Sequence, residues 1–300
     1  MLNNIPISAK VQGLFSMEVR SASGEMVSKT EMFPNLVLDQ GLELLGTTNP
    51  LEFCSVGSGV ATPQKSDTTL EAHIATSRSQ PEGKDVISGF NVSEGYNWVR
   101  KVFRFNQGTA TGNISEVGVG GNNKLFNRTL VKDSQGLFAT VTVMEDETLD
   151  VTVELRAYVD QNTRQYTVNM SGVDYTLRTE PVYIPFRGNS SHALHSSGVI
   201  QYGTTAYSDG ISSRTGTPTR TIASFTGTGA TTRQRDYVAG SKKQVFEFYW
   251  GLNAGNSAPT RTIVVPTSVG VYQTEFTPAI PKTSDHILRL TFEVSWDRYE

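Results

Sequence analysis

Two histidines, His192 and His195, are the first candidates for chemistry in this chain of 300 residues. Their spacing of three would place two metal ligands on one face of a helix. No carboxylate or third histidine lies near them in the sequence, and two histidines are too few for a zinc site. His73 and His286 are isolated. We therefore expect ordinary loop histidines and no metal site.

A second candidate is the acidic cluster of Glu145, Asp146 and Glu147, with Asp150 close behind. Adjacent carboxylates can bind calcium or serve as acid and base in glycoside hydrolysis. The residues around them lack the Asx-rich loop with a central glycine that a calcium site requires. The cluster also falls between two predicted strands. We therefore expect a solvated charged turn and no catalytic residue.

Glycine clusters and the single cysteine complete the candidates. Gly57-Ser-Gly59 and Gly118-Val-Gly120-Gly121 are rich enough in glycine to suggest a phosphate cradle. A phosphate cradle needs a helix directly after the glycines, and neither cluster precedes one, so both are interpreted as turns with no cofactor. Cys54 is flanked by Phe53, Ser55 and Val56, which predicts a small buried residue rather than a reactive thiol.

The elements that would position these residues are mostly strands. Residues 287–297 alternate between apolar and polar side chains, and residues 149–159 do the same. A period of two is typical of a strand with one buried and one solvated face. Glycine-rich and asparagine-rich breaks separate the further expected strands, which are 11–20, 53–60, 85–93, 96–106, 113–120, 124–131, 136–144, 244–250, 260–265 and 270–276. The pattern predicts an all-β, mainly antiparallel fold of one or two β-sandwich-like domains.

One short helix is expected near residues 37–46, with Asp39 as its cap and Gly46 as its stop. Residues 1–160 are predicted to form a first domain that contains this helix. Residues 161–300 form a second, beginning with a hairpin near 160–180 and including a long polar loop region near 187–243. A short internal repeat, Val102–Phe105 and Val245–Phe248, favours two similar halves, whereas chance likeness between β strands is the alternative.

Composition excludes several classes of partner. The net charge is −3, and no run of a single sign stands out, so we expect neither nucleic-acid binding nor membrane insertion. The first residues lack the basic and apolar regions of a signal peptide, which predicts synthesis in the cytosol. Residues 187–243 are poor in core-forming side chains, and such backbone is often ordered by a partner.

Four segments carry a resemblance to a known family. Asn35–Leu45 has the form of a short helix with a central Gly-Leu, and it precedes Cys54-Ser-Val-Gly-Ser-Gly-Val-Ala-Thr-Pro63 and Asp67-Thr-Thr-Leu70. Together these resemble the N-terminal half of tailed-bacteriophage virion proteins of the tail, tail-fibre and baseplate. The ending Leu290–Arg298 is similar to their last strand. The resemblance covers about the first 160 residues and the last strand.

The resemblance implies a non-enzymatic virion structural protein, a tail, tail-tip, baseplate or collar component. It would be assembled in the host bacterial cytoplasm and would dock as a symmetric homo-oligomer against other tail or neck proteins. Long fibrous repeats are absent, which disfavours a fibre shaft. A receptor- or carbohydrate-binding module of a tail fibre, contacting a host surface glycan, is the alternative, and an enzyme such as a depolymerase is a third reading. Aromatic residues that could line a sugar site are Tyr96, Trp98, Tyr202, Tyr207, Tyr249 and Trp250.

Overall fold

A computed structural model describes most of the chain, namely residues 4–91, 93–182, 207–208, 228–229, 231–256, 259–267 and 270–300. Its strands form four sheets, and one short helix accompanies them. The expected all-β, mainly antiparallel class is confirmed.

The largest sheet has nine strands. Seven of them lie in the order β18, β19, β22, β1, β13, β8, β7, and β2 and β3 also pair with β1. Their bounds are β1 (Ile5–Arg20), β2 (Met26–Lys29), β3 (Phe33–Pro34), β7 (Ile87–Asn91), β8 (Tyr96–Phe105), β13 (Thr148–Val159), β18 (Thr231–Gln234), β19 (Lys243–Trp250) and β22 (Leu288–Arg298). β1 pairs antiparallel with β13 and parallel with β22, so strands from both predicted domains share this sheet.

The alternating pattern explains the buried face of this sheet. Leu288, Leu290, Phe292, Val294 and Trp296 on β22 are all buried, as the sequence predicts. The apolar face of β13 is buried as well. Its opposite face was expected to be solvated, and this is wrong for two positions: Asp150 and Glu154 are only 7% and 2% exposed. Arginines of β8 lie across them, as described below.

A five-stranded sheet shares an apolar core with the large sheet. It consists of β4 (Leu36–Val37), β11 (Lys124–Leu130), β10 (Glu116–Gly121), β5 (Phe53–Gly57) and β6 (His73–Ser77). The helix α1 (Asp39–Leu44) lies against β11 and β22, and a two-strand ribbon is formed by β9 (Gly112–Ile114) and β12 (Val141–Val143).

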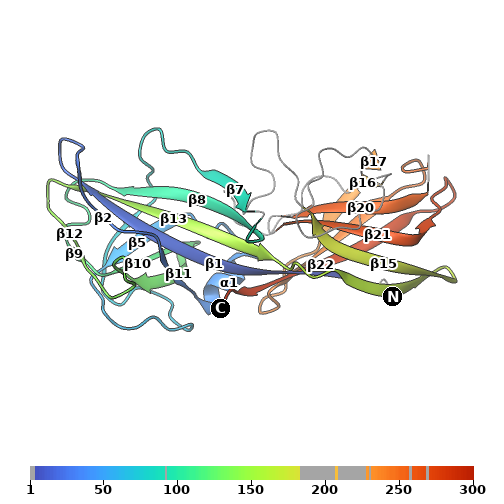
Figure 1. Cartoon of the computed structure of the whole chain (residues 1–300), viewed down its shortest axis with the longest axis horizontal. Helices are drawn as coiled ribbons and strands as arrows, with labels where there is room; N and C mark the ends of the chain where they lie inside the picture. The colour runs from blue at the N-terminus through green and yellow to red at the C-terminus, as the bar shows by residue number, and fades with distance from the viewer. Residues whose placement is uncertain are drawn as a thin grey trace.

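The remaining sheet has six strands and belongs to the second half of the chain. It consists of β14 (Arg164–Met170), β15 (Val173–Val182), β21 (Gly270–Ile280), β20 (Thr260–Thr267), β16 (Tyr207–Ser208) and β17 (Thr228–Gly229). The hairpin expected near 160–180 is β14–β15. Figure 1 shows an elongated molecule in which β2, β9 and β12 lie near one end and β16 and β17 near the other.

The two copies of the short repeat occupy corresponding places. Phe103 and Phe105 of β8 stand opposite Val151 and Leu149 of β13, and all four side chains are buried. Phe246 and Phe248 of β19 stand opposite Phe292 and Leu290 of β22, also buried. Most of the polar region 187–243 lies outside the described residues.

Three expectations need correction. The helix begins at Asp39 after Leu38, and no side chain caps it, because the Asp39 carboxylate instead accepts a hydrogen bond from Arg298. The strand expected over 136–144 is only Val141–Val143, because Asp133 accepts the amides of Gln135 and Leu137 and bends the chain. The strand expected over 113–120 is divided at Ser115 between β9 and β10.

Across the described part of the chain, α1, six residues long, is the single α-helix, and no helix has the length and apolar character needed to cross a membrane.

Candidate functional site

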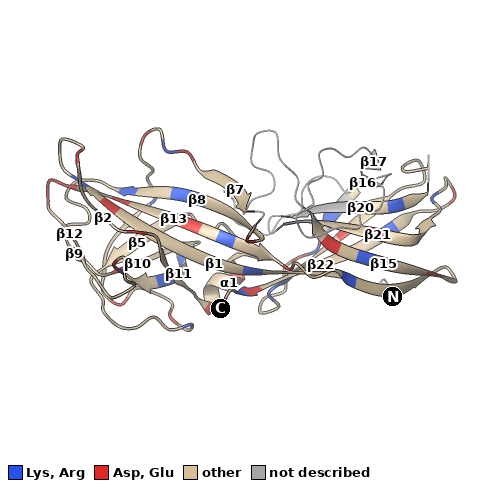
Figure 2. Ribbon diagram, in the orientation of Figure 1, with Lys and Arg blue, Asp and Glu red and all other residues tan. Residues whose placement is uncertain are grey.

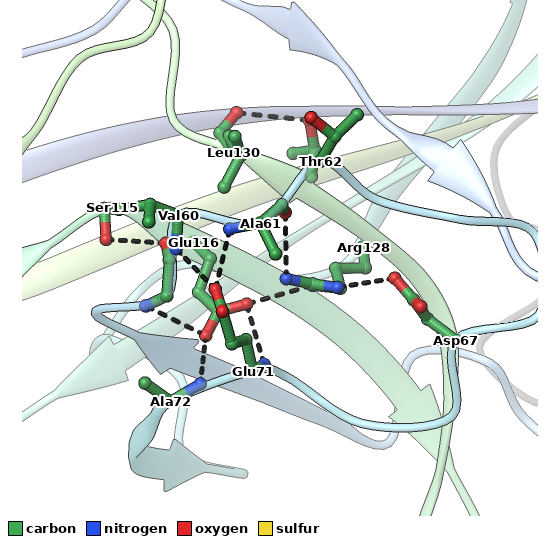
Figure 3. Close-up of polar contacts among 12 residues, drawn as sticks. Val60, Ala61, Thr62, Asp67, Glu71, Ala72, Ser115, Glu116, Arg128 and Leu130 are labelled. Atoms are coloured by element: carbon green, nitrogen blue, oxygen red, sulfur yellow. Dashed lines mark hydrogen bonds and ion pairs between the residues drawn. The ribbon is translucent and has the colours of Figure 1, made fainter.

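The segment 58–72, which joins β5 to β6, is a loop held in place by charged side chains. We call it the 58–72 loop. Three of its backbone amides donate hydrogen bonds to the carboxylate of Glu116 on β10 (Figure 3). The Gly59 and Ala72 nitrogens lie 3.1 and 2.7 Å from Oε1, and the Glu71 nitrogen lies 3.1 Å from Oε2. Glu116 therefore fastens both ends of the loop.

Arg128, on the neighbouring strand β11, neutralises this buried carboxylate. Its Nε lies 2.9 Å from Glu116 Oε2, its Nη1 lies 2.5 Å from Asp67 Oδ2, and its Nη2 donates to the Ala61 carbonyl at 3.2 Å. The Arg128 and Glu116 side chains are only 4% and 0% exposed. A buried ion pair is tolerated only where further hydrogen bonds satisfy both groups, which is the case here. We call Glu116, Arg128 and Asp67 the loop cluster.

Glu71 closes the loop from its outer side. Its carboxylate accepts hydrogen bonds from the Val60 and Ala61 amides at 2.6 and 2.7 Å. These two bonds, with a smaller contribution from the Arg128 charge, lower the pKa of Glu71 below its ordinary value. The start and the end of the loop are thereby joined a second time.

Two glycines make room for this arrangement. A Cβ atom at Gly59 would collide with Glu116 Oε1 and with the Glu71 side chain. A Cβ atom at Gly41 in α1 would collide with the Phe126 carbonyl, so the helix can approach β11 only because this position is glycine. Both glycines belong to the segments that carry the family resemblance.

The four resembling segments meet in the fold, although the last strand is far from the other three in the sequence. From the last strand, Trp296 Nε1 donates to the Leu42 carbonyl at 2.7 Å, and Arg298 Nε donates to the Val37 carbonyl at 2.5 Å. The helix segment then contacts the 58–72 loop. The Asp39 amide donates to the Lys65 carbonyl at 2.8 Å, and Gln40 Nε2 donates to the Thr68 carbonyl at 2.9 Å.

A second group of ion pairs lies on the outer face of the large sheet, and we call it the outer ladder. Arg104 of β8 donates two hydrogen bonds to Asp150 of β13, at 2.7 and 2.6 Å. Further along, Glu154 is paired with Arg100 and with Arg156, at 2.5 and 2.7 Å. Figure 2 shows these basic and acidic positions side by side on β8 and β13. The hydrogen bonds that Arg104 donates to Asp150 raise the pKa of Arg104.

A hollow of about 290 Å³ opens beside the 58–72 loop. It lies between the loop, β5, β6 and the start of β11. The residues that line it are Phe53, Ser55, Thr68, Thr69, Leu70, His73, Thr76, Arg78, Asn123 and Leu125. We call it the loop hollow.

The acidic residues singled out from the sequence do not form one cluster. Glu145, Asp146 and Glu147 form the expected turn between β12 and β13, with the first two exposed and Glu147 accepting the Met144 amide at 2.8 Å. Asp150 is separated from them, because strand β13 has begun and turns it toward Arg104.

The glycine clusters and Cys54 have different outcomes. Gly57–Gly59 leads into the 58–72 loop as expected, but Gly118–Gly121 lies inside strand β10, so its interpretation as a turn is wrong. The β11 carbonyls of Asn127 and Lys124 lie where side chains at Gly118 and Gly120 would be. Cys54 is buried, as predicted, and burial raises the pKa of its thiol.

The described histidines and aromatic residues are dispersed. His192, His195 and Tyr202 lie outside the described residues. His286 contacts Thr283, and among the described residues no group of three His, Cys, Asp or Glu side chains could hold a metal ion. The aromatic rings of β8 are covered by arginines: Arg156 lies 4.5 Å from the Tyr96 ring centroid, and Arg100 lies 5.2 Å from the Trp98 centroid. Trp250 is buried and Tyr207 lies in β16.

Glu116, Arg128 and Asp67 were missed by sequence reasoning. A signal exists, because Glu116 and Arg128 are the single charges within the otherwise uncharged runs 113–121 and 125–131, which form adjacent strands. A charge in such a run needs a partner of opposite sign when it is buried.

Comparisons with protein families, with curated proteins and with solved structures find no match to this chain.

Proposed function

We propose that this chain is a non-enzymatic structural protein of a tailed-bacteriophage virion, a tail, tail-tip, baseplate or collar component. It is assembled in the host cytoplasm and docks as a symmetric homo-oligomer against other tail or neck proteins. The observation that supports this proposal is the meeting of the four resembling segments. Trp296 and Arg298 hold α1 through Leu42 and Asp39, and α1 holds the 58–72 loop. The resemblance thus falls on one framework of contacts rather than on scattered strands.

The chemistry of this framework favours a structural role. The carboxylates of Glu116 and Glu71 accept backbone amides, and Arg128 bridges Glu116, Asp67 and a backbone carbonyl. Groups arranged this way fix a loop, because their polar atoms are bound to protein partners rather than directed at a substrate. A rigid, largely exposed loop at the end of a sheet suits docking because little conformational entropy is lost on association.

The experiment is to locate the chain in virions of a phage that encodes it. An epitope is inserted at the exposed turn of Gly24, and in a second variant at the β14–β15 turn of Gly172, where nothing lies near the backbone. Gold-labelled antibody should bind purified particles at one fixed, symmetry-repeated position. The two insertions should give distinct distances along the particle. Epitope found only in the soluble lysate, with washed particles unlabelled, would contradict the proposal.

The homo-oligomer is tested on the purified chain by native mass measurement. We expect a discrete multimer, either alone or on addition of particle-free tail proteins. A chain that stays monomeric under both conditions would contradict docking as a symmetric homo-oligomer.

A further inference from the structure

The loop hollow has an apolar floor. Phe53, Leu70 and Leu125 are 7%, 7% and 5% exposed, and with Leu38 they form a small hydrophobic cluster distinct from the main core. The volume of the loop hollow, about 290 Å³, lies just below the range for ligand sites, about 300–1,000 Å³. A site of this size accepts a single ring, with the rest of a larger ligand left outside.

Polar groups capable of both donating and accepting surround this floor. The hydroxyls of Ser55 and Thr76 lie 2.7 Å apart, and Thr76 Oγ1 lies 2.8 Å from His73 Nε2. Thr68, Thr69 and Asn123 complete the rim with exposed side chains. Hydroxyl and imidazole groups linked in this way match the alternating donors and acceptors of a ligand rich in hydroxyl groups.

Arg78 gives the loop hollow a positive charge. The guanidinium of Arg78 lies over the Phe53 ring, 5.5 Å from its centroid, on an exposed side chain. No aspartate or glutamate is among the lining residues. A guanidinium next to an apolar surface, with no acidic neighbour in the hollow, suits a carboxylate that is attached to a ring.

The loop cluster fixes this hollow before any ligand arrives. Asp67, held by Arg128, directly precedes Thr68, and Gln40 holds the Thr68 carbonyl. Leu70 is followed by two residues whose amides are bound to Glu116. The loop that supplies Thr68, Thr69 and Leu70 is therefore preorganised, which lowers the entropy lost on binding.

We propose that the loop hollow binds an acidic monosaccharide unit of a glycan, a pyranose that bears a carboxylate. The C–H face of the sugar lies on Leu70, Leu125 and the accessible edge of Phe53. The carboxylate pairs with Arg78, and ring hydroxyls bond to Thr76, His73 and the rim threonines. This site does not depend on the virion assignment, since it follows from the lining residues alone.

The test uses methyl glucuronide and its neutral counterpart, methyl glucoside, titrated into the full chain with amide chemical shifts as the readout. The glucuronide should shift the amides of Thr76, Arg78 and Leu70 in a saturable way. The glucoside should bind about tenfold more weakly, because it lacks the charge-assisted bonds to Arg78. Acetate and inorganic phosphate are titrated as anions without the sugar ring.

The variant Arg78→Gln should lose about tenfold in glucuronide affinity and keep its affinity for the glucoside. Arg289→Gln is the matched control, because Arg289 is an exposed arginine on β22 outside the hollow. Thermal unfolding of both variants checks that the fold is retained.

Equal binding of glucuronide and glucoside, or glucuronide binding unchanged by Arg78→Gln, would overturn the proposal. Shifts by acetate or phosphate as large as those by glucuronide would show a general anion site and would also overturn it. None of these outcomes bears on where the chain lies in a virion, so the two proposals fail separately.

Discussion

The loop cluster and the outer ladder are built from the same side chains, arginines paired with carboxylates, but they differ in what else they bind. In the loop cluster both Arg128 and Glu116 are buried, and Glu116 also accepts three backbone amides of an irregular loop. In the outer ladder Arg104 and Arg100 remain 30% and 41% exposed. The backbone beneath the ladder is already held by the pairing of β8 with β13.

The difference shows where charged side chains are needed to position the backbone. Strand pairing satisfies backbone groups along β8 and β13, so the ladder adds side-chain contacts to a sheet that is fixed by other means. The 58–72 loop has no such pairing over most of its length, and its amides would be unsatisfied without the carboxylates. We therefore expect substitutions in the loop cluster to cost more stability than matched substitutions in the ladder.

Arg128→Ala should have the largest effect. The substitution leaves Glu116 buried with its charge uncompensated, which costs about 3–5 kcal/mol of unfolding free energy. Urea denaturation of the purified chain measures this difference. A loss of less than about 1 kcal/mol, the usual size for an ordinary surface position, would mean that water reaches Glu116 and that the cluster is not buried.

Asp150→Ala should cost less, about 1–2 kcal/mol, since Arg104 stays partly hydrated when its partner is removed. The same urea measurement serves, and Arg104→Ala provides the complementary half of a double-mutant cycle. If Asp150→Ala cost as much as Arg128→Ala, the contrast between the two groups would be lost.

The titration of Glu71 tests whether its carboxylate binds the loop amides in solution. The pKa of Glu71 is lowered in the folded chain, so its contribution is present above the ordinary value of 4.5 and is lost as the pH falls through the folded pKa. The amide shifts of Val60 and Ala61 should follow one titration with a midpoint below 4.5. Glu71→Gln should abolish that titration. A midpoint at or above 4.5 would show that these hydrogen bonds do not form in solution.

Lys10→Ala should have the smallest effect. Lys10 and Asp297 are 3.9 Å apart, and both side chains are 56% exposed. Such pairs contribute about 0–1 kcal/mol, and we expect the lower half of that range. A cost above about 1 kcal/mol, measured in the same urea denaturation series, would show that this exposed ion pair stabilises the pairing of β1 with β22.

The sequence predicted the elements whose side chains alternate strictly. The alternating run over residues 149–159 lies within β13, and the apolar set from Leu288 to Trp296 is buried as expected. The short helix was placed within two residues of α1 at each end. These features are local, since period and burial are encoded in neighbouring residues.

Pairing between strands that are distant in the sequence could not be predicted from local patterns. The parallel contact of β1 with β22 joins residues near opposite ends of the chain, and nothing in either strand specifies it. The Gly118–Gly121 cluster was interpreted as a turn because glycine is typical of turns, whereas the close approach of β11 decides that it is a strand. The loop hollow depends on β5, β6, β11 and the 58–72 loop together.

The account rests on the claim that Glu116 holds the 58–72 loop. Hydrogen exchange of the Gly59, Glu71 and Ala72 amides tests it most directly, in the wild type, in Glu116→Gln and in Asp150→Asn as the control. We predict that these three amides are protected in the wild type and exchange at least about tenfold faster in Glu116→Gln, while Asp150→Asn leaves them unchanged. Equal protection of these amides in the wild type and in Glu116→Gln would contradict the account.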